Sequence, residues 1–559
     1  MPIRPGGPGV LSRLWYRELP HYPTPGRRYA NLAIVVITTV VLYYMLYVQY
    51  AVATSIITHY GMSYTYFVWV SVLGNLVGAF TSLVAGLADR WGRANLVVYG
   101  LLVAGLLLVF ALPSAPDKTL YTVVFCLVGL VEGIVLVATP ALIRDFSPQL
   151  GRATAMGYWT MGPVLGSLVV TVVTSSTLDS SSWQDELRYS GFAGLIVFVA
   201  ALFALRELSP GLRGQVMVSL RDRALVEARA RRGGSGPAEA GRAGTGASWR
   251  QMLRLDVVGS AAAISVFLLL YFAAVGNFVV YFSANFGYSQ QRTNALANWY
   301  WGANAIALVA VGLLSDRVRV RKPFMLVGAV GSIAATSVFA VLATHHSTGY
   351  YTFAWLFVAI GVLSGVAYAP WMAGFTETVE KHNPAATATG LAVWGWTLRI
   401  VVAASSAVLP LVVTSASPLV EHGEAVAAAQ REAGPALKVV NAHASLFAQL
   451  GKYPAGQAPQ DVTARAVREV GPAGLALVQK AQPQLAVLQH YGPQVQKASE
   501  DGPGQWRTWW WVTVGGQVVF VPFIFVMAGR WSPRKAREDE RAHREAAERE
   551  ELELAGDTA

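Results

Sequence analysis

The sequence has very little cysteine and very little charge. Its single cysteine, Cys126, stands in an apolar run of the 559 residues, which excludes an intrachain disulfide and a cysteine-based metal site. Charged residues make up only 13% of the chain, against 54% hydrophobic residues and a mean hydropathy of +0.42. An ordinary soluble domain carries about twice that share of charge. The composition therefore predicts a membrane protein.

Motifs for nucleotide binding and for catalysis are also missing. No Gly-x4-Gly-Lys-Ser/Thr run occurs, which argues against direct drive by ATP. No nucleophile, general base and orienting residue stand together, so we expect no enzyme activity, no cofactor and no metal site. The 43 Lys and Arg exceed the 32 Asp and Glu, but they lie between the apolar runs. We interpret this excess as a sign of membrane orientation and not of nucleic-acid binding.

Apolar runs long enough to cross a bilayer, which takes about 20 residues, occur twelve times. They begin near residues 30, 64, 95, 119, 153, 189, 257, 294, 323, 351, 385 and 508. Four segments do not belong to this series of apolar runs and short loops: 1–29, 206–256, 415–507 and 529–559. We therefore predict an all-α membrane protein with twelve transmembrane helices and a small helical insertion at 415–507.

The distribution of basic residues predicts the orientation of these helices. The N-terminal 29 residues hold five arginines and no cleavable small-residue site, so we expect a cytoplasmic tail and not a signal peptide. Short loops on that side hold nine Lys and Arg, against three on the other, and segment 206–256 adds ten Arg. We expect both termini to be cytoplasmic, residues 415–507 to be extracytoplasmic, and the protein to lie in the cytoplasmic (inner) membrane.

The second half of the chain repeats the first. Residues 85–93 read Ala-Gly-Leu-Ala-Asp-Arg-Trp-Gly-Arg after the second run, and residues 312–321 follow the eighth run with a similar pattern, 227 residues later. The glycine pair Gly129 and Gly133 of the fourth run recurs in the tenth at 361–365. Such repeats, with a substrate site at mid-membrane between them, are typical of secondary transporters. We predict two six-helix bundles, formed by 30–205 and by 257–414 together with 508–528, joined by a basic linker at 206–256.

Residues 86–93 resemble the signature of the major facilitator superfamily, in which Gly-x-Leu-Ala-Asp-Arg-x-Gly-Arg-Arg/Lys joins spans two and three. Asp89, Arg90, Gly92 and Arg93 match, whereas the second copy has Arg319 in place of the internal glycine. The resemblance covers the twelve runs and the linker but not 415–507. It implies two six-helix bundles that rock about a central cavity.

Charged residues in the two repeated loops predict a conformational latch. Arg93 can reach Asp89 in its own loop or Asp145 at the end of the fourth run. A latch that forms in one arrangement of the bundles and breaks in the other biases the two-state equilibrium that alternating access needs. The alternative is that these loops only anchor helices at the headgroups. The predicted latch residues are Asp89, Arg90, Arg93, Asp145, Asp316, Arg317 and Glu377.

The fifth run contains Gly157 and then Gly162-Pro163-x-x-Gly166. This resembles the Gly-Pro-x-x-Gly-Gly run that the superfamily associates with proton-coupled antiporters, with Ser167 in place of the last glycine. Small residues at this spacing also let helices pack closely, and proline permits a kink. Antiport and helix packing alone are therefore both open interpretations.

Two charged residues stand inside the predicted spans, Glu132 in the fourth and Arg399 in the eleventh. A charge at mid-bilayer costs at least about 2.5 kcal/mol, so each must face a cavity or a partner. If the two pair in one state and separate in another, the proton affinity of Glu132 alternates, which couples transport to protons. The alternatives are a permanent bridge between the halves, or Arg399 as a receptor for an anionic group of the substrate.

Polar and aromatic residues recur at helical spacing in spans one, seven and ten. In the superfamily, spans one, four, seven and ten line the cavity, so a ring-bearing or amphipathic solute is expected there. The alternative is that these polar faces hold helices together. With the two charged residues, the predicted substrate-binding set is Tyr43, Tyr47, Tyr50, Glu132, Asn277, Tyr281, Tyr368, Trp371 and Arg399.

These features predict a monomeric secondary transporter of a small organic solute, coupled to protons, whose partners are membrane lipids, the solute and protons. The Gly-Pro run favours export by antiport, and the aromatic residues serve uptake of a sugar or carboxylate by symport equally well. A third hypothesis is a sensor or assembly partner that no longer transports. Residues 415–507 could cap the outer vestibule, dock a partner in the cell envelope, or pack passively, and the alternating Arg and Glu of 529–559 predict a solvated helix.

Overall fold

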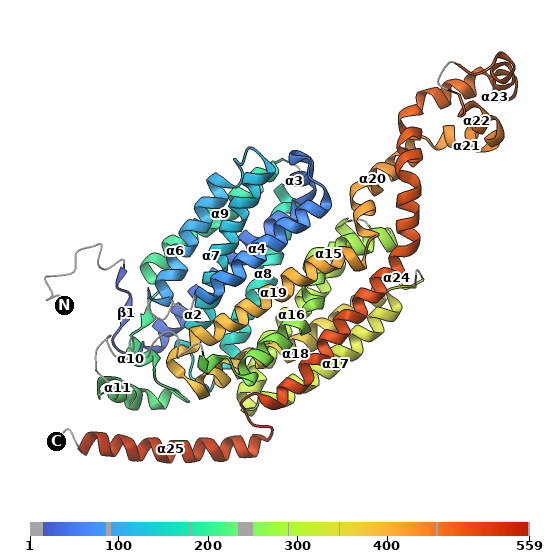
Figure 1. The fold of residues 1–559 in the computed structure, drawn as a ribbon. Coiled ribbons are helices and arrows are strands. Elements are labelled where there is room, and N and C mark those ends of the chain that lie inside the picture. Colours follow the sequence, from blue (N-terminus) through green and yellow to red (C-terminus); the bar gives the residue numbers. More distant parts are fainter. Residues whose placement is uncertain are drawn as a thin grey trace. The chain divides into compact units, whose positions relative to one another are not determined.

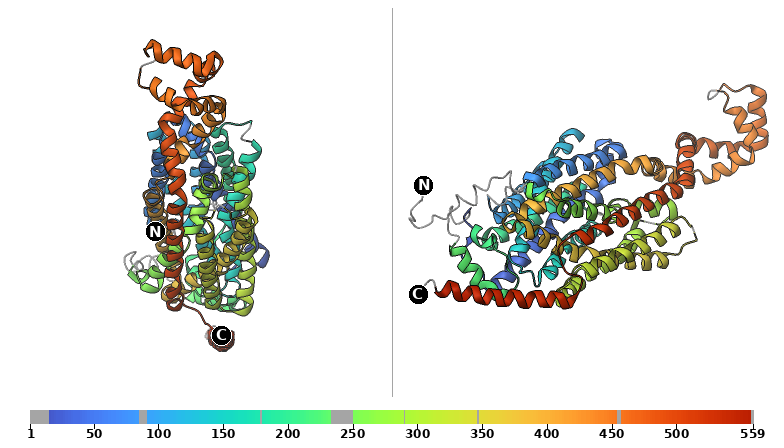
Figure 2. Two further views of the ribbon diagram at one scale, coloured as in Figure 1. Left: turned by 90° about the vertical axis from the view of Figure 1, so that its right-hand side faces the viewer. Right: turned by 60° about the horizontal axis from the view of Figure 1, so that its bottom comes forward.

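The structure is a computed structural model that describes residues 15–84, 91–177, 180–232, 250–288, 290–345, 347–453 and 457–556. It falls into two compact units. The first comprises Met1–Val279, Ser289–Val408 and Trp509–Ala559, and the second comprises Val280–Tyr288 and Leu409–Thr508. The helices of the first unit run side by side, as the views in Figures 1 and 2 show.

The first half of the bundle consists of long apolar helices with clear start signals. Asp117 caps α7 by accepting hydrogen bonds from Thr119 N at 2.7 Å and Leu120 N at 2.9 Å, and Ser182 with Asp185 forms a capping box at α9. The elements are α2 (Pro25–Ala51), α3 (Ala53–Tyr60), α4 (Tyr64–Val84), α6 (Arg93–Leu106) with the π-helix η2 (Leu107–Ala111), α7 (Lys118–Asp145), α8 (Arg152–Thr177) and α9 (Trp183–Ala204).

A short linker region follows α9 and pairs with the N-terminal segment. Strand β2 (Glu207–Leu208) runs parallel to β1 (Glu18–Leu19), the two strands of one small sheet. Three short helices complete the linker: α10 (Pro210–Arg213), the 3-10 helix η3 (Leu220–Asp222) and α11 (Arg223–Arg232).

The second half of the bundle repeats the plan of the first. Its elements are η4 (Leu255–Gly259), α14 (Ser260–Phe267), α15 (Leu269–Phe286), α16 (Gln290–Val318), α17 (Lys322–Leu342), α18 (Tyr350–His382), η5 (Pro384–Ala386) and α19 (Thr387–Val412). The remaining helices are α20 (Ala416–Glu432), α21 (Gly434–Ala442), α22 (Ala444–Leu450), α23 (Gln460–Lys480), α24 (Gln482–Val526) and α25 (Pro533–Gly556).

The number of spans agrees with the number predicted from the sequence. Among the described residues, eleven helices are long and apolar enough to cross a membrane. Leu255–Phe267 and Leu269–Val275, which meet at a bend of 42°, are together long and apolar enough for a twelfth span if the bent pair is counted as one. Large apolar side chains such as Phe80, Ile196 and Ile306 are exposed, as lipid-facing residues of such helices are. The predicted fold class, an all-α membrane protein with twelve spans, is confirmed.

The internal repeat recurs in how the helices pack. A Cβ atom on Gly129 of α7 would lie 2.7 Å from the backbone oxygen of Gly74 in α4, so α7 and α4 touch backbone to backbone. In the second half, a Cβ on Gly361 of α18 would lie 2.6 Å from the backbone oxygen of Tyr300 in α16. The glycine pairs of the fourth and tenth runs therefore serve the same packing role.

The second unit is a small helical body. A cluster of Ala433, Ala436 and Ala481 forms its centre, with Leu437 and Leu485 packed against it. Helix α24 is 45 residues long. The extracytoplasmic position of 415–507 remains a prediction.

Candidate functional site

Glu132 and Arg399, the two charged residues predicted inside the spans, form an ion pair. Glu132 Oε2 lies 2.8 Å from Arg399 Nη2, and the residues are only 2% and 4% exposed. The contact is not aligned as a hydrogen bond, so opposite charge is what holds it. Glu132 belongs to α7 and Arg399 to α19, so the pair joins the first half of the bundle to the second.

Gly78 of α4 makes the space that the guanidinium of Arg399 occupies. A Cβ at Gly78 would overlap Arg399 Nη1 and would lie 2.9 Å from the backbone oxygen of Gly129. Gly133, one turn further along α7, approaches the backbone oxygen of Gly78 closely in the same way. The facing glycines of α4 and α7 thus form the surface beside which the ion pair lies.

Tyrosines gather around this ion pair. Tyr43 of α2 interacts electrostatically with Glu132, Arg399 and Tyr368, which come from three other helices. Its ring lies 5.3 Å from that of Tyr47. Tyr271 of α15, which the sequence did not single out, neighbours both Tyr43 and Tyr47. The structure therefore brings the predicted polar faces of spans one and ten to the ion pair.

Three further members of the predicted set are Tyr50, Tyr281 and Asn277. Tyr50 lies at the far end of the stripe on α2, with its ring 6.4 Å from those of Tyr47 and Phe67, and it also interacts electrostatically with Glu132 and Arg399. Tyr281 is fully buried and packs edge-on against Trp506 at 5.1 Å, within the second unit. Asn277 is part of α15, but its side chain lies outside the described part of the structure.

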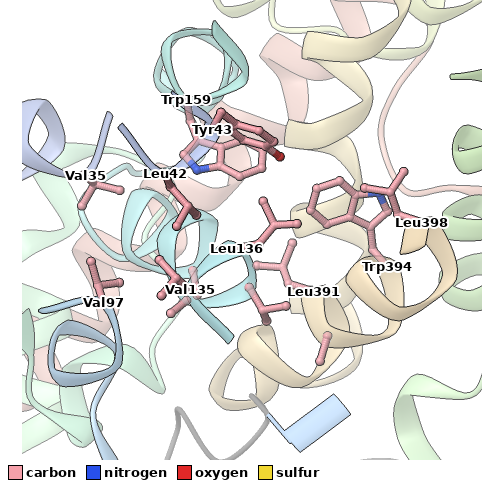
Figure 3. Close-up of a cluster of buried hydrophobic side chains, with 14 of the residues drawn as sticks. Val35, Leu42, Tyr43, Val97, Val135, Leu136, Trp159, Leu391, Trp394 and Leu398 are labelled. Atoms are coloured by element: carbon pink, nitrogen blue, oxygen red, sulfur yellow. The ribbon is translucent and has the colours of Figure 1, made fainter. Parts of the chain in front are cut away.

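Tryptophans from both halves form an aromatic cluster, part of which Figure 3 shows with Tyr43, Trp159 and Trp394 among core aliphatic side chains. The ring of Trp394 lies 6.0 Å from that of Trp159 in α8 and 6.0 Å from that of Trp371 in α18. Trp371 in turn stacks on Tyr368, with an angle of 9° between the rings. The predicted residue Trp371 is thus connected to the ion pair through Tyr368 and Tyr43.

The Gly-Pro run of α8 makes close helix contacts. A Cβ on Gly166 would lie 2.7 Å from Tyr43 Cβ, and one on Gly162 would lie 2.9 Å from Thr39 Cβ, so this face of α8 fits against α2. Pro163 lies inside the helix between them. A Cβ on Gly157 would lie 2.5 Å from the backbone oxygen of Leu308 in α16. All three glycines are therefore needed where backbones approach.

The predicted latch residues of the first half do meet. Arg93 Nη1 lies 2.6 Å from both carboxylate oxygens of Asp145, and both side chains are fully buried. Glu207 of β2 accepts a hydrogen bond of 2.6 Å from the backbone N–H of Arg93 and lies 3.2 Å from Arg213. Burial raises the pKa of the Glu207 carboxyl, although Arg213 and Arg93 act in the opposite direction. Asp89 and Arg90 lie outside the described residues.

In the second half, Arg321 occupies the place predicted for Arg317. Arg321 Nη1 lies 2.8 Å from Asp316, and its Nη2 lies 3.2 Å from Glu377, whereas Arg317 is exposed. Asp316 also accepts hydrogen bonds from Thr154 of the first half, at 2.7 Å from the backbone N–H and 2.6 Å from the hydroxyl. The reason is the turn after α16, where Arg319 adopts φ 65° and the chain folds back.

Glu380, which was not among the predicted latch residues, joins the two halves at this end of the bundle. It lies on α18 of the second half and accepts from Arg144 Nε at 2.6 Å and from Arg152 Nη1 at 2.7 Å, both from the first half. Gln149 adds a hydrogen bond of 3.0 Å, and Glu380 is 3% exposed. Its position three residues after Glu377, on the same helix face, is the signal that could have revealed it. We call the end of the bundle that holds these residues the latch end.

Segments outside the spans cover the latch end. Arg144 Nη1 donates to the backbone oxygen of Arg213 at 2.7 Å, and Leu150 N donates to that of Val218 at 2.9 Å, so the linker is fastened to the first half. Helix α25 lies beside α11 (Figures 1 and 2). It contacts the linker through His543 and Asp222, 3.2 Å apart, and through Glu550 and Arg229. It contacts the turn after α16 through Glu540 and Arg319.

The acidic side chains of the latch end lie together with their basic partners. Within the described ranges, no group of three or more His, Cys, Asp or Glu residues is placed to hold an ion. The carboxylates at the latch end are instead neutralised by arginine, as a closed ionic contact requires.

A comparison with known families decides the family. The family model described as the Major Facilitator Superfamily matches residues 35–404. The chain belongs to the major facilitator superfamily. Like the family, this superfamily member is a multi-pass secondary transporter, and the matched range contains both Glu132 and Arg399.

Solved structures of other members have the same fold. The superfamily member studied here resembles the proton:xylose symporter XylE bound to 6-bromo-6-deoxy-D-glucose, with a TM-score of 0.57 and 14% identity, over 70% of this chain and 90% of that one. A double-tryptophan mutant of XylE gives a TM-score of 0.55 and 14% identity, over 70% and 89% of the two chains. At this identity the likeness shows the fold alone.

Proposed function

We propose that this superfamily member carries a small organic solute across the membrane by alternating access, and that Glu132 couples the movement to protons. The observation that carries the proposal is the buried ion pair of Glu132 with Arg399, which joins the two halves. Rocking of the halves changes the distance between α7 and α19 and so makes or breaks this pair. A conformational change of the halves therefore moves the positive charge of Arg399 toward or away from the Glu132 carboxylate.

The coupling step is proton uptake by the separated carboxylate. While Arg399 is in contact, its positive charge favours the ionised form of Glu132. When the pair separates, the carboxylate is left in a low-dielectric interior in which the neutral, protonated form is favoured. Proton binding thus favours one arrangement of the halves and proton release favours the other.

We propose that the latch end is cytoplasmic and closed in the arrangement seen here. The arginines of its loops and linker support the cytoplasmic side through the positive-inside rule. Glu380 with Arg144 and Arg152 forms a buried ionic contact between the halves, and Asp316 accepts hydrogen bonds from the backbone of α8. Both contacts must break for a central site to open toward this side.

The coupling proposal is tested by proton movement in proteoliposomes. A panel of organic acids, amines and sugars is added to vesicles that contain wild type or the Glu132→Gln variant. We expect at least one solute to drive proton movement in wild type and none to do so in the variant. Unchanged proton movement in the variant would show that the ion pair is only structural.

The latch proposal is tested by Glu380→Gln, with Glu377→Gln as the matched control. Removing one partner of a buried ion pair costs about 3–5 kcal/mol, because the other partner is left as an uncompensated charge. Glu380 neutralises two arginines of the opposite half, whereas Glu377 contacts Arg321 of its own half. We expect the first variant to increase thiol labelling of cysteines introduced at the latch end and the control to increase it less. Equal labelling of the two variants would contradict the latch.

The direction of transport stays a prediction, for which the Gly-Pro run favoured export by antiport. Gly162 and Gly166 pack against α2, so helix packing alone accounts for the run as well as antiport does. In antiport the proton and the solute occupy the Glu132–Arg399 pair in turn, whereas in symport they occupy it together. The donors around that pair therefore bear on the choice between them.

A further inference from the structure

Two buried tryptophans of the aromatic cluster, Trp371 and Trp394, have indole N–H groups without an acceptor in the part of the chain that the structure describes. Trp371 is 0% and Trp394 1% exposed, and neither Nε1 atom has a hydrogen-bond acceptor among the described residues. The neighbouring Trp159 differs, because its Nε1 donates to Thr139 Oγ1 at 3.1 Å. A buried donor without an acceptor is destabilising, and native structures rarely keep one without a reason.

Arg399 adds a third unused donor to this region. Its Nη2 contacts Glu132, but its Nε is buried without an acceptor in the described part of the chain. A guanidinium offers five N–H groups in a planar fork, and a single contact to one carboxylate oxygen leaves most of them available. The edge of the fork that carries Nε can bind a second carboxylate with two parallel hydrogen bonds.

The donors near the ion pair suit a carboxylate. Among the described side-chain amides, Asn304 of α16 donates to the backbone oxygen of Gly361 at 2.9 Å, and Asn75 of α4 donates to that of Ser71 at 2.9 Å. A sugar hydroxyl group both donates and accepts, whereas a carboxylate only accepts, and guanidinium and indole N–H groups only donate. The N–H groups of Arg399, Trp371 and Trp394 therefore match a carboxylate, and the stacked rings of Tyr368 and Trp371 offer a flat apolar surface.

On the basis of the proposed function, we propose that the solute is a ring-bearing carboxylate anion and that it moves together with the proton, by symport. The carboxylate accepts from Arg399 and from the indole N–H groups of Trp371 and Trp394, and its ring stacks on Tyr368. The proton binds the carboxylate of Glu132, which breaks the Glu132–Arg399 pair. The anion then replaces Glu132 as the partner of Arg399, so the charge of the site is unchanged.

This exchange of partners determines the sign of the coupling. An anion and a proton assist each other, because protonation of Glu132 frees the guanidinium that the anion needs. A cationic solute would instead compete with the proton for Glu132, and the result would be antiport. The excess of donors around the pair favours the first case.

The test is calorimetric binding to the purified full-length protein at pH 6 and pH 8. The probes are benzoate and 2-naphthoate, which are anions at both pH values, with benzylamine and D-xylose as comparison solutes. We expect both acids to bind, more tightly at pH 6, and the Glu132→Gln variant to bind them equally at the two pH values. Failure of both acids to bind wild type, or binding of benzylamine in their place, would overturn the proposal.

Tryptophan variants test the donors themselves. Trp371→Phe and Trp394→Phe keep a flat ring and remove the N–H, so we expect about tenfold weaker binding of the acids, since a hydrogen bond to a charged acceptor is lost. Trp159→Phe is the matched control, because its N–H is already bound to Thr139, and we expect its affinity to stay within about twofold. Equal affinities in all three variants would overturn the assignment of the donors. If the donor variants do not fold, the pH dependence in wild type and Glu132→Gln decides.

The two proposals fail in different ways. If the acids bind with an affinity that does not depend on pH, and proton movement is unchanged in Glu132→Gln, the coupling fails and the solute class stands. If benzylamine drives proton movement that Glu132→Gln abolishes, the coupling stands and the solute class is wrong.

Discussion

Gly78 is the residue on which the position of the Arg399 guanidinium depends most directly. The Gly78→Ala variant places a methyl group where Arg399 Nη1 now lies, next to the backbone oxygen of Gly129. Overpacking of this kind costs about 1–3 kcal/mol, which corresponds to a factor of about 5 to 150 in an equilibrium constant. We expect solute-driven proton movement in proteoliposomes to fall by about that factor.

Gly302 of α16 provides the control for this substitution. A Cβ atom there meets nothing within 4 Å, so Gly302→Ala changes helix propensity without filling occupied space. We expect full proton movement in this variant. A similar loss in both variants would show that any alanine in these helices impairs transport and that Gly78 has no special relation to Arg399.

The pKa of Glu207 gives a prediction about pH. Burial raises this pKa in the folded protein, so the folded state binds the proton more tightly than the unfolded state does. The contribution of Glu207 to stability is therefore present in full below its unfolded pKa of about 4.3, and it falls as the pH rises through the folded value. We expect the melting temperature of wild type, relative to Glu207→Gln, to decrease from pH 4 to pH 7. A relative increase over that range would contradict the raised pKa.

The sequence predicted the charged residues that stand inside apolar helices, where charge is rare. It missed some of those at helix ends, where charge is common. Glu132 and Arg399 stand out because a charge inside an apolar helix is costly. Glu380 lies near the end of α18, where charges are ordinary, and its spacing from Glu377 is a weak signal that does not identify Arg144 and Arg152 as its partners. Arg321 replaced the predicted Arg317 because a left-handed turn at Arg319 changes the direction of the chain, which spacing alone does not reveal.

At the scale of elements, the two repeated loops contain the same turn built from different residues. Gly92 adopts φ 92° and Arg319, its counterpart in the repeat, adopts φ 65°. Glycine tolerates this region at little cost, whereas an arginine there is strained by about 1 kcal/mol or more. The side chain of Arg319 is used in compensation, because it contacts Glu540 of α25.

This comparison predicts opposite outcomes at the two positions. We expect Gly92→Ala to lower the free energy of unfolding by more than about 1 kcal/mol, since the new Cβ meets the Glu207 carboxylate as well as an unfavourable φ. We expect Arg319→Gly to be neutral or stabilising, because a partly exposed ion pair contributes only about 0–1 kcal/mol. Denaturant titration of both variants measures the difference, and a destabilised Arg319→Gly would show that the contact with Glu540 outweighs the strain.

Helices were easier to predict than the short elements that join them. The long apolar runs specify spans by length and composition, and the glycine pairs in runs four and ten predicted the repeat that the packing shows. The two-residue strands β1 and β2 carry no periodic pattern, and their pairing depends on a contact between segments almost 190 residues apart, Glu18 with Glu207. The bend between α14 and α15 likewise has no signal such as proline at Leu268.

At the scale of the whole molecule, α25 connects parts that belong to different halves. It contacts the linker, which is fastened to the first half, and the turn after α16, which belongs to the second. Deletion of residues 533–559 removes these contacts together. We expect the shortened protein to show greater thiol labelling at the latch end, by a few-fold, because surface ion pairs each contribute up to about 1 kcal/mol. High salt should reduce the difference from wild type, since it screens the same contacts, and labelling that is identical to wild type would exclude this role for α25.

The lone thiol of Cys126, which lies half-buried on α7, has a practical consequence for spectroscopy. A single substitution, Cys126→Ser, yields a background free of cysteine, in which any two introduced thiols can carry spin labels without competition. Trp91 and Arg317 are exposed and occupy the two repeated loops, one in each half. A distance distribution between labels at these positions would record the opening of the latch end directly, in the membrane and during turnover.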